Sequence, residues 1–145
     1  MTQIKSALAT VRDTLIEGVA LVAVSKTKPV ELLQEAYEAG QRDFGENKVQ
    51  EMALKAEAMP KDIRWHMIGH LQRNKARRTL PVVDLLHSGD SLRLLEAVQR
   101  LSAEMGRTTD VLLEVNVSGD AAKHGLAPEE LEPSLPALAQ LDCLR

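Results

Sequence analysis

The spacing of apolar residues switches repeatedly along the chain between a strand-like and a helix-like pattern. Short apolar runs and period-two alternation predict five strands, at residues 20–26, 41–44, 64–68, 82–87 and 111–117. Apolar residues three and four apart predict a helix after each strand, at residues 29–39, 47–59, 72–79, 90–105 and 128–140. A further helix is expected at residues 3–15, and residues 142–145 have the pattern of a sixth strand that is just opening.

This alternation of strands and helices predicts a parallel sheet built from right-handed crossovers. An open doubly wound sheet and a closed eight-stranded barrel both contain such a sheet. The fifth predicted strand points Glu114 and Asn116 to one face, and a barrel interior offers such polar residues hydrogen-bonding partners. The pattern therefore favours a TIM-type (β/α) barrel, here a partial barrel of about five units with an extra N-terminal helix, as one domain over residues 1–145. The other face of the fifth strand, expected to lie under helices, holds Val111, Leu113, Val115 and Val117.

Composition and charge narrow the classes of function. The 145 residues include 18 Lys and Arg against 21 Asp and Glu, and they hold one Trp, one Tyr and one Phe. This weak negative charge and the few stacking side chains argue against a nucleic-acid partner. No apolar run approaches the roughly 18 residues that suggest a membrane span, so no membrane association is expected. Cys143 is the only cysteine, which excludes an internal disulfide and favours the cytoplasm.

Lys26 ends the first predicted strand and shares a face with Val22 and Val24. A lysine at a strand end usually extends its amine into water. An amine surrounded by aliphatic side chains is instead less hydrated and more readily neutral, and a neutral amine attacks an aldehyde to form a Schiff base. Lys28 lies just before Pro29, where the next helix begins, and is expected to point outward.

The histidines give weaker signals. His66 and His70 flank Gly69 on a predicted strand and its loop, so they lack the one-face geometry of a helical zinc pair. They are interpreted as structural or cofactor-lining residues. Lys123 and His124 fall in a long loop after the fifth strand, which is interpreted either as a lid or as plain solvated chain.

Two polar residues after strands are interpreted as helix caps. Asn47 is expected to cap the helix that follows it, and Asp90 the helix after the fourth strand. His87, Ser88 and Asp90 include residue types found in hydrolytic triads, but their closeness in sequence prevents the relay geometry.

Five motifs resemble one known family. They read AVSKTKP at 23–29, FGENKVQE at 44–51, WHMIGHLQRNK at 65–75, LHSGDS at 86–91 and LLEVNVSGDAAKHGL at 112–126. Their order and spacing resemble those of the pyridoxal-phosphate homeostasis protein family, which is similar in fold to the N-terminal barrel of alanine racemase. The resemblance implies that Lys26 carries pyridoxal 5′-phosphate as a Schiff base and that Asn47 lies near the cofactor. Ser88 and Asn116, near the ends of the fourth and fifth strands, are predicted to complete the cofactor-binding set.

Three functions remain open at this stage. The first is a non-catalytic pyridoxal-phosphate carrier, monomeric if folded, which serves vitamin B6 homeostasis and delivers the cofactor to apo enzymes. The second is a racemase-like enzyme, which needs a second acid or base that Tyr37, in the first crossover helix, is poorly placed to supply. The third is a C-terminally truncated product without cofactor binding, because a complete barrel has roughly 250 residues and commonly binds phosphate after strands seven and eight.

Overall fold

The computed structural model describes residues 2–145 and contains one five-stranded parallel sheet. Its strands follow the order β1-β2-β3-β4-β5, which is also their order in the sequence. Adjacent parallel strands in sequential order form the arrangement of a TIM-type barrel, whereas a doubly wound sheet reverses direction at its centre. The predicted partial barrel is therefore confirmed. The strands are β1 (Ala23–Val24), β2 (Asp43–Glu46), β3 (Arg64–Met67), β4 (Leu85–Gly89) and β5 (Asp110–Leu113).

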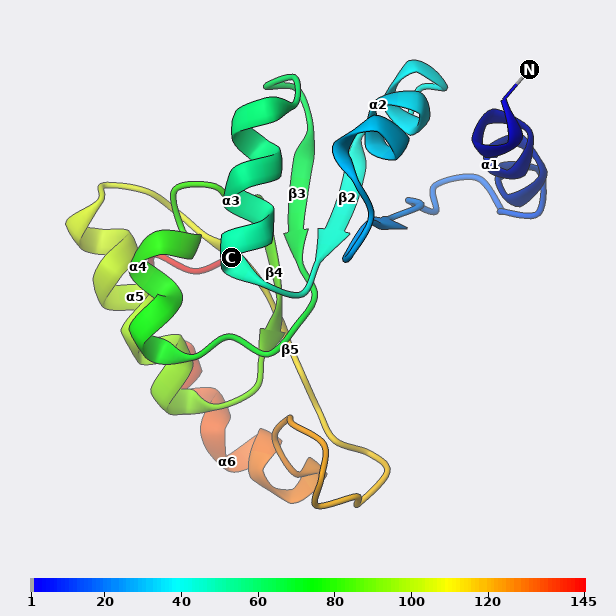
Figure 1. Ribbon diagram of the computed structural model, residues 1–145. Helices are drawn as coiled ribbons and strands as arrows, with labels where there is room; N and C mark the ends of the chain where they lie inside the picture. The colour runs from blue at the N-terminus through cyan, green and yellow to red at the C-terminus, as the bar shows by residue number, and fades with distance from the viewer. Residues whose placement is uncertain (1) are drawn as a thin grey trace.

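Helices α3, α4 and α5 cover one side of the sheet, and α1 and α6 lie at opposite ends of the molecule (Figure 1). The helices are α1 (Gln3–Asp13), α2 (Val30–Glu38), α3 (Val49–Ala58), α4 (Ala76–Thr79), α5 (Leu92–Glu104) and α6 (Pro128–Leu138), and a 3-10 turn, Arg73–Lys75, leads into α4. No helix among residues 2–145 combines the length and apolar character needed to cross a membrane.

The predicted opening of a sixth strand is confirmed beside β5. Leu144 pairs in parallel with Thr109. The N–H of Thr109 donates to the Cys143 carbonyl at 2.9 Å, and the N–H of Arg145 donates to the Thr109 carbonyl at 3.0 Å. Residues 143–145 thus continue the same sequential order on the far side of β5.

The hydrophobic core lies between the sheet and its helices. Phe44 and Trp65, on neighbouring strands, are both buried, and their ring centroids lie 6.0 Å apart. Leu33 of α2 and Met52 of α3 belong to the same buried cluster. Strand residues that alternate with this core point to the opposite side, which we call the inner face. It carries Val22, Val24, Asp43, Gly45, Arg64, His66, Ile68 and His87.

The alternation predicted for the first strand is confirmed at Val24 and Ser25. Ser25 is buried on the helix side, whereas Val24 is 55% exposed on the inner face. The helix cover predicted for all of the fifth strand is wrong in part. Val111 packs against the core, but Leu113 is 41% and Val117 is 83% exposed. Regular pairing ends at Leu113, so the chain beyond it is not held against the helix layer.

Element boundaries differ from the predicted ones near the strand ends. β2 begins at Asp43, two residues later than predicted. Helix α3 begins at Val49 after the extended residue Lys48, so the prediction that Asn47 caps this helix is wrong. Asn47 lies one residue too early, and Lys48 at the cap position makes no side-chain cap hydrogen bond.

Candidate functional site

Lys26 lies in the turn that follows β1, at the carboxyl end of the sheet, and is exposed. Ser25 before it points toward the helices, and strand alternation continued past β1 predicts that Lys26 shares the inner face with Val24. Within residues 2–145 its amine makes no hydrogen bond or ion pair, and the expected shell of aliphatic side chains is open to solvent on this face. Lys28 is also exposed and lines a groove on the helix side with Ile4 and Leu8 of α1.

A buried ionic group anchors the chain immediately before Lys26. The Lys55 ammonium, on α3, donates to the Ser25 carbonyl at 2.7 Å and to Glu46 Oε1 at 2.6 Å. The Ser25 hydroxyl donates to the same Glu46 oxygen at 2.6 Å. The Glu46 side chain is fully buried, and its second oxygen, Oε2, has no partner within the described residues. We call Ser25, Glu46, Glu51 and Lys55 the Lys55 cluster.

The same cluster anchors the residue after Lys26. Glu51 Oε1 accepts a hydrogen bond from the Thr27 N–H at 2.6 Å and another from Lys55 at 2.7 Å. These bonds, that of Lys55 foremost, lower the pKa of Glu51 below its ordinary value. Thr27 has a φ of 63°, a conformation that is uncommon for a residue other than glycine. Lys26 thus lies between two residues whose backbones are held by hydrogen bonds, while its own side chain makes none within residues 2–145.

Sequence reasoning did not identify Glu46, Glu51 or Lys55. Glu51 and Lys55 are four apart on one helix, the spacing of a surface ion pair, which was the one available signal. Burial of Lys55 depends on Ser25, thirty residues earlier in the chain, so no local pattern shows it.

Two glycines allow close packing near the carboxyl end of the sheet. A β-carbon on Gly45 would lie 3.1 Å from Ile68 and 3.2 Å from Val22, both on the inner face. A β-carbon on Gly69 would lie 2.5 Å from the Asn47 carbonyl, so the loop after β3 and the loop after β2 touch through backbone here. Asn47 is half-buried, and its side-chain amide makes no hydrogen bond within residues 2–145.

The other two predicted cofactor residues lie in different surroundings. Ser88 is 2% exposed, and its hydroxyl has no partner within residues 2–145, so it is shielded from the open inner face. The Asn116 amide is occupied by its own loop, because Nδ2 donates to the Asp120 carbonyl at 2.9 Å and Oδ1 accepts from the Ser118 hydroxyl at 2.8 Å. The structure brings neither side chain together with Lys26.

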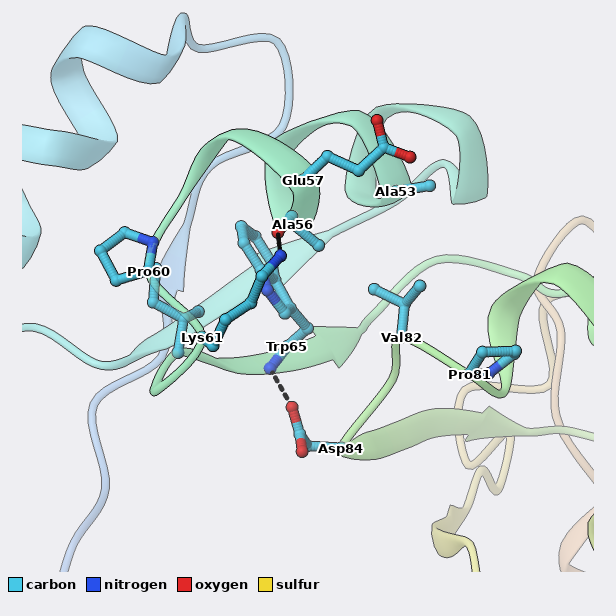
Figure 2. A pocket seen from close by; sticks show the side chains of 10 residues that line it. Ala53, Ala56, Glu57, Pro60, Lys61, Trp65, Pro81, Val82 and Asp84 are labelled. Carbon is cyan, nitrogen blue, oxygen red and sulfur yellow. Dashed lines mark hydrogen bonds between the residues drawn. The ribbon is translucent and has the colours of Figure 1, made fainter.

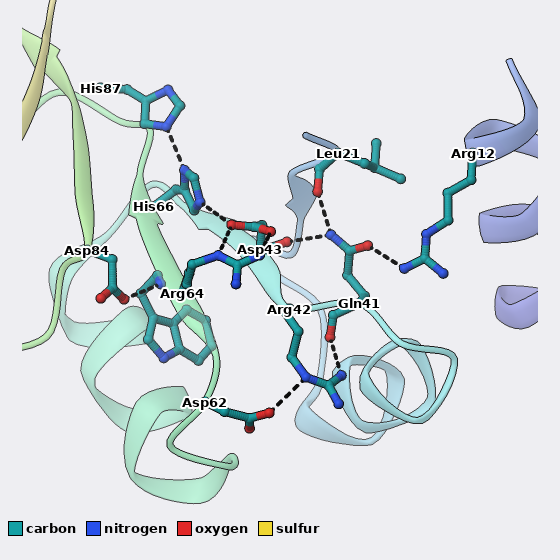
Figure 3. Close-up of polar contacts among 11 residues, drawn as sticks. Arg12, Leu21, Gln41, Arg42, Asp43, Asp62, Arg64, His66, Asp84 and His87 are labelled. Atoms are coloured by element: carbon teal, nitrogen blue, oxygen red, sulfur yellow. Dashed lines mark hydrogen bonds and ion pairs between the residues drawn. The ribbon is translucent and has the colours of Figure 1, made fainter. Parts of the chain in front are cut away.

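A chain of polar contacts crosses the inner face (Figure 3). Arg64 donates two hydrogen bonds to Asp43, from Nε to Oδ1 at 2.7 Å and from Nη2 to Oδ2. Asp43 Oδ1 also lies 2.9 Å from His66 Nε2, and His66 Nδ1 lies 2.8 Å from His87 Nε2. The Arg64 hydrogen bonds, aided by His66, lower the pKa of Asp43, while burial and the adjacent His66 lower the pKa of His87. Through these two contacts His66 connects β2, β3 and β4.

The cap predicted at Asp90 is also wrong. Ser91 is the N-cap of α5, and its hydroxyl accepts from the Leu94 N–H at 3.2 Å. Asp90 instead lies 2.6 Å from His70 Nδ1, so its carboxylate turns toward the loop after β3.

The opposite, amino-terminal end of the sheet carries different features. Tyr37, at the end of α2, donates to Asp62 at 2.8 Å, and Asp62 lies two residues before β3. Figure 2 shows a pocket at this end between α3 and the starts of β3 and β4, where the Trp65 N–H donates to Asp84 at 2.7 Å. Neither feature lies at the carboxyl end that carries Lys26.

Comparison with known proteins gives the family. Residues 1–145 match the family model "Alanine racemase, N-terminal domain". A pyridoxal phosphate homeostasis protein from Pseudomonas aeruginosa is 43% identical over 145 residues, which cover 97% of this chain and 61% of that protein. A protein of the same name from Synechocystis sp. is 40% identical over 134 residues, covering 91% of this chain and 62% of that protein.

Solved structures agree with the sequence matches. PipY from Synechococcus elongatus, solved without pyridoxal phosphate, has a TM-score of 0.95 and 42% identity over 99% of this chain and 67% of that one. The structure of PipY with pyridoxal phosphate bound has a TM-score of 0.91 at the same identity and coverage. Alanine racemase from Clostridium difficile, at 14% identity and a TM-score of 0.77 over 98% of this chain and 37% of that one, shares the fold.

The fold and its matches define a barrel of the alanine racemase type. The chain belongs to the alanine racemase N-terminal domain family, and the predicted kinship with the pyridoxal phosphate homeostasis proteins is confirmed. It spans about three fifths of the length of the two curated relatives described above.

Proposed function

We propose that this protein binds pyridoxal 5′-phosphate through Lys26 and serves vitamin B6 homeostasis as a carrier without catalysis of its own. One observation carries the proposal: the amine of Lys26 is free, while the residues on both sides of it are fixed by the Lys55 cluster. The relatives named pyridoxal phosphate homeostasis protein and the pyridoxal-phosphate complex of PipY support the choice of ligand.

The residues around Lys26 fit this cofactor. Val22 and Val24 lie on the inner face and offer apolar contacts to a flat ring. The unpaired amide of Asn47 is available to a polar ring substituent. The cofactor supplies an aldehyde; the Lys26 amine bonds to its carbon as a Schiff base, and the aldehyde oxygen leaves as water with two hydrogens from the ammonium nitrogen.

Carriage rather than racemisation is favoured by the placement of Tyr37. A racemase requires a second proton donor or acceptor opposite the lysine. The hydroxyl of Tyr37 donates to Asp62 at the amino-terminal end of the sheet, and that hydrogen bond raises the pKa of the phenol. Apo enzymes that use pyridoxal phosphate are the partners that a cytoplasmic carrier of this kind would supply.

The test is to add pyridoxal phosphate, record the absorption change of Schiff-base formation, reduce with borohydride and map the modified lysine by mass spectrometry. We expect one modified site, Lys26, and loss of the absorption change in Lys26→Ala. Lys28→Ala is the matched control, because Lys28 is also exposed, lies two residues away and should leave the signal intact.

Two results would contradict the proposal. Modification spread over several lysines, or trapped mainly at Lys28, would mean that exposure alone decides reactivity. Racemisation of an amino acid that disappears in Lys26→Ala would replace the carrier with an enzyme.

A further inference from the structure

Three side chains from three separate loops meet at the carboxyl end of the sheet. His70 follows β3, Asp90 follows β4 and His124 lies in the loop after β5. Each offers one ligand atom, and these atoms all lie within 4.8 Å of one another. The two imidazole rings stack nearly parallel, with centroids 3.8 Å apart and an interplanar angle of 6°. We call these residues the His70 group.

The distances suit a common ion. Asp90 Oδ2 lies 2.6 Å from His70 Nδ1 and 4.0 Å from His124 Nδ1. Two ligand atoms on a tetrahedral zinc ion, each bonded at about 2.0–2.1 Å, lie about 3.3 Å apart. Each Asp90 separation differs from that value by less than about 1 Å, and because an imidazole binds zinc in its ring plane, both rings must also rotate out of their parallel stack to share one ion.

The carboxylate of Asp90 faces the two histidines and does not cap the neighbouring helix. The Asp90 side chain is 6% exposed, and Ser91 is the N-cap of α5. A carboxylate with so little access to water needs hydrogen bonds or a cation. The side chains of His70 and His124 are 40% and 55% exposed, so an ion can reach the group from solvent.

His124 is held in place by the backbone around it. Gly125 has a φ of 116°, and a β-carbon there would lie 2.7 Å from the Asn116 nitrogen. The Asn116 N–H donates to the Leu126 carbonyl, and the Leu126 N–H donates to the Glu114 carbonyl, both at 2.8 Å. These contacts join the two ends of the loop of residues 117–125. The backbone at His124 is therefore fixed next to the end of the strand.

The protein also contains a useful contrast. The inner-face chain has two histidines and one aspartate as well, but His66 lies in its middle and uses one ring nitrogen for Asp43 and the other for His87. These two nitrogens point in different directions, so the three residues share no common point. The His70 group is a triangle, whereas the inner-face chain is linear.

We propose that His70, Asp90 and His124 bind one divalent transition-metal ion, with zinc as the best match. Two imidazole nitrogens and one carboxylate oxygen are ligands that Zn²⁺ accepts, and three protein ligands leave a fourth position for water or a small molecule. His70 Nδ1 faces the Asp90 carboxylate, so when that nitrogen binds the ion, the single proton of the neutral imidazole is carried on Nε2. Lys26 is not one of the ligands, so ion binding here extends beyond cofactor carriage.

The test is calorimetric titration of the chelator-treated chain with Zn²⁺, together with the visible spectrum after adding Co²⁺. We expect one zinc ion per chain and the visible spectrum of tetrahedral cobalt. His70→Ala and His124→Ala should each weaken zinc binding by at least about tenfold.

His87→Ala is the matched control, because it removes a histidine from the linear chain and should leave zinc affinity unchanged. Lys26→Ala should also bind zinc normally, which separates this proposal from the one on cofactor binding. Circular dichroism checks that each variant is folded. Because the His124 side chain is the most exposed of the three, His124→Ala should disturb folding the least. Absence of saturable zinc binding, unchanged affinity in both ligand variants, or an equal loss in His87→Ala would overturn the proposal.

Discussion

The polar side chains on the two faces of β2 are organised differently. On the helix-covered face, Glu46 belongs to the closed Lys55 cluster, in which the Lys55 side chain is 6% exposed and Glu46 is fully buried. On the inner face, Asp43 belongs to an open chain that runs sideways to His87, with the Arg64 side chain 59% exposed at its start. The two networks lie on one strand, three residues apart.

This difference separates two structural tasks. The Lys55 cluster connects α3 to the turn after β1 and so fixes the residues around Lys26. The inner-face chain connects neighbouring strands, β2 to β3 to β4. A charge buried without water is costly to leave unpaired, whereas an exposed partner is screened by solvent. The helix-side network should therefore contribute more to stability than the inner-face network.

The largest expected effect is that of Lys55→Met. The substitution leaves the Glu46 carboxylate buried and unpaired, so the free energy of unfolding should fall by about 3–5 kcal/mol. Urea denaturation measures this loss. Lys61→Met is the matched control, because it removes an exposed lysine whose amine donates a hydrogen bond only to the Ala56 carbonyl within the described residues. Adding Glu46→Gln to Lys55→Met should recover part of the loss, because the neutral amide leaves no charge to compensate.

Borohydride trapping at Lys26 gives a second readout for Lys55→Met. If the cluster positions the turn, trapping should weaken even under conditions where the variant remains folded. Stability equal to that of the Lys61 control would show that the buried ion pair matters no more than a surface contact, and the contrast between the two faces would disappear.

A smaller effect is expected from Asp43→Asn. The change removes the ionic partner of Arg64 and weakens the hydrogen bond to His66, and the exposed guanidinium recovers solvation. We expect a loss of about 1–2 kcal/mol in the free energy of unfolding, measured by the same denaturation. Asp62→Asn, which removes the exposed partner of Arg42, should cost less. A loss at Asp43 as large as that at Lys55 would contradict the ranking of the two faces.

Most of the sheet was predictable because strand faces follow a local rule. The predicted second strand, 41–44, begins two residues before β2, Asp43–Glu46. A shift of two residues leaves the alternation of side chains between the two faces unchanged. The helices followed from apolar spacing in the same way, as in α5, whose buried residues Leu94, Leu95 and Val98 repeat with a helical period.

The site was less predictable because its contacts join residues far apart in sequence. Asp90 has the position of a helix cap by local rules, yet its partner His70 is twenty residues away. Lys55 has the position of a surface residue of α3, and its burial depends on the turn at Ser25. The cofactor-binding role predicted for Lys26 comes from a motif that resembles a known family. The periodicity of apolar residues alone does not predict that role.

The smallest expected effect concerns pH and separates the two faces once more. Burial, aided by His66, holds the pKa of His87 below its ordinary value of about 6.5. As the pH falls past that value, the unfolded chain takes up a proton that the folded chain does not, so the free energy of unfolding decreases until the pH passes the folded pKa. Glu51 on the other face has its pKa lowered from a carboxylate value of about 4.3, so its contribution is lost only in more acidic solution.

Urea denaturation between about pH 7.5 and pH 5.5, the range around an ordinary histidine pKa, should therefore show a decrease that is smaller in His87→Gln than in the parent chain. Glutamine retains a hydrogen-bonding group toward His66 but does not titrate. Glu51→Gln should lower stability at both pH values by a similar amount, because this carboxylate stays ionised throughout that range. If the parent chain and His87→Gln lost the same stability on acidification, His87 would not be the titrating group, and its lowered pKa could no longer distinguish the two networks by pH.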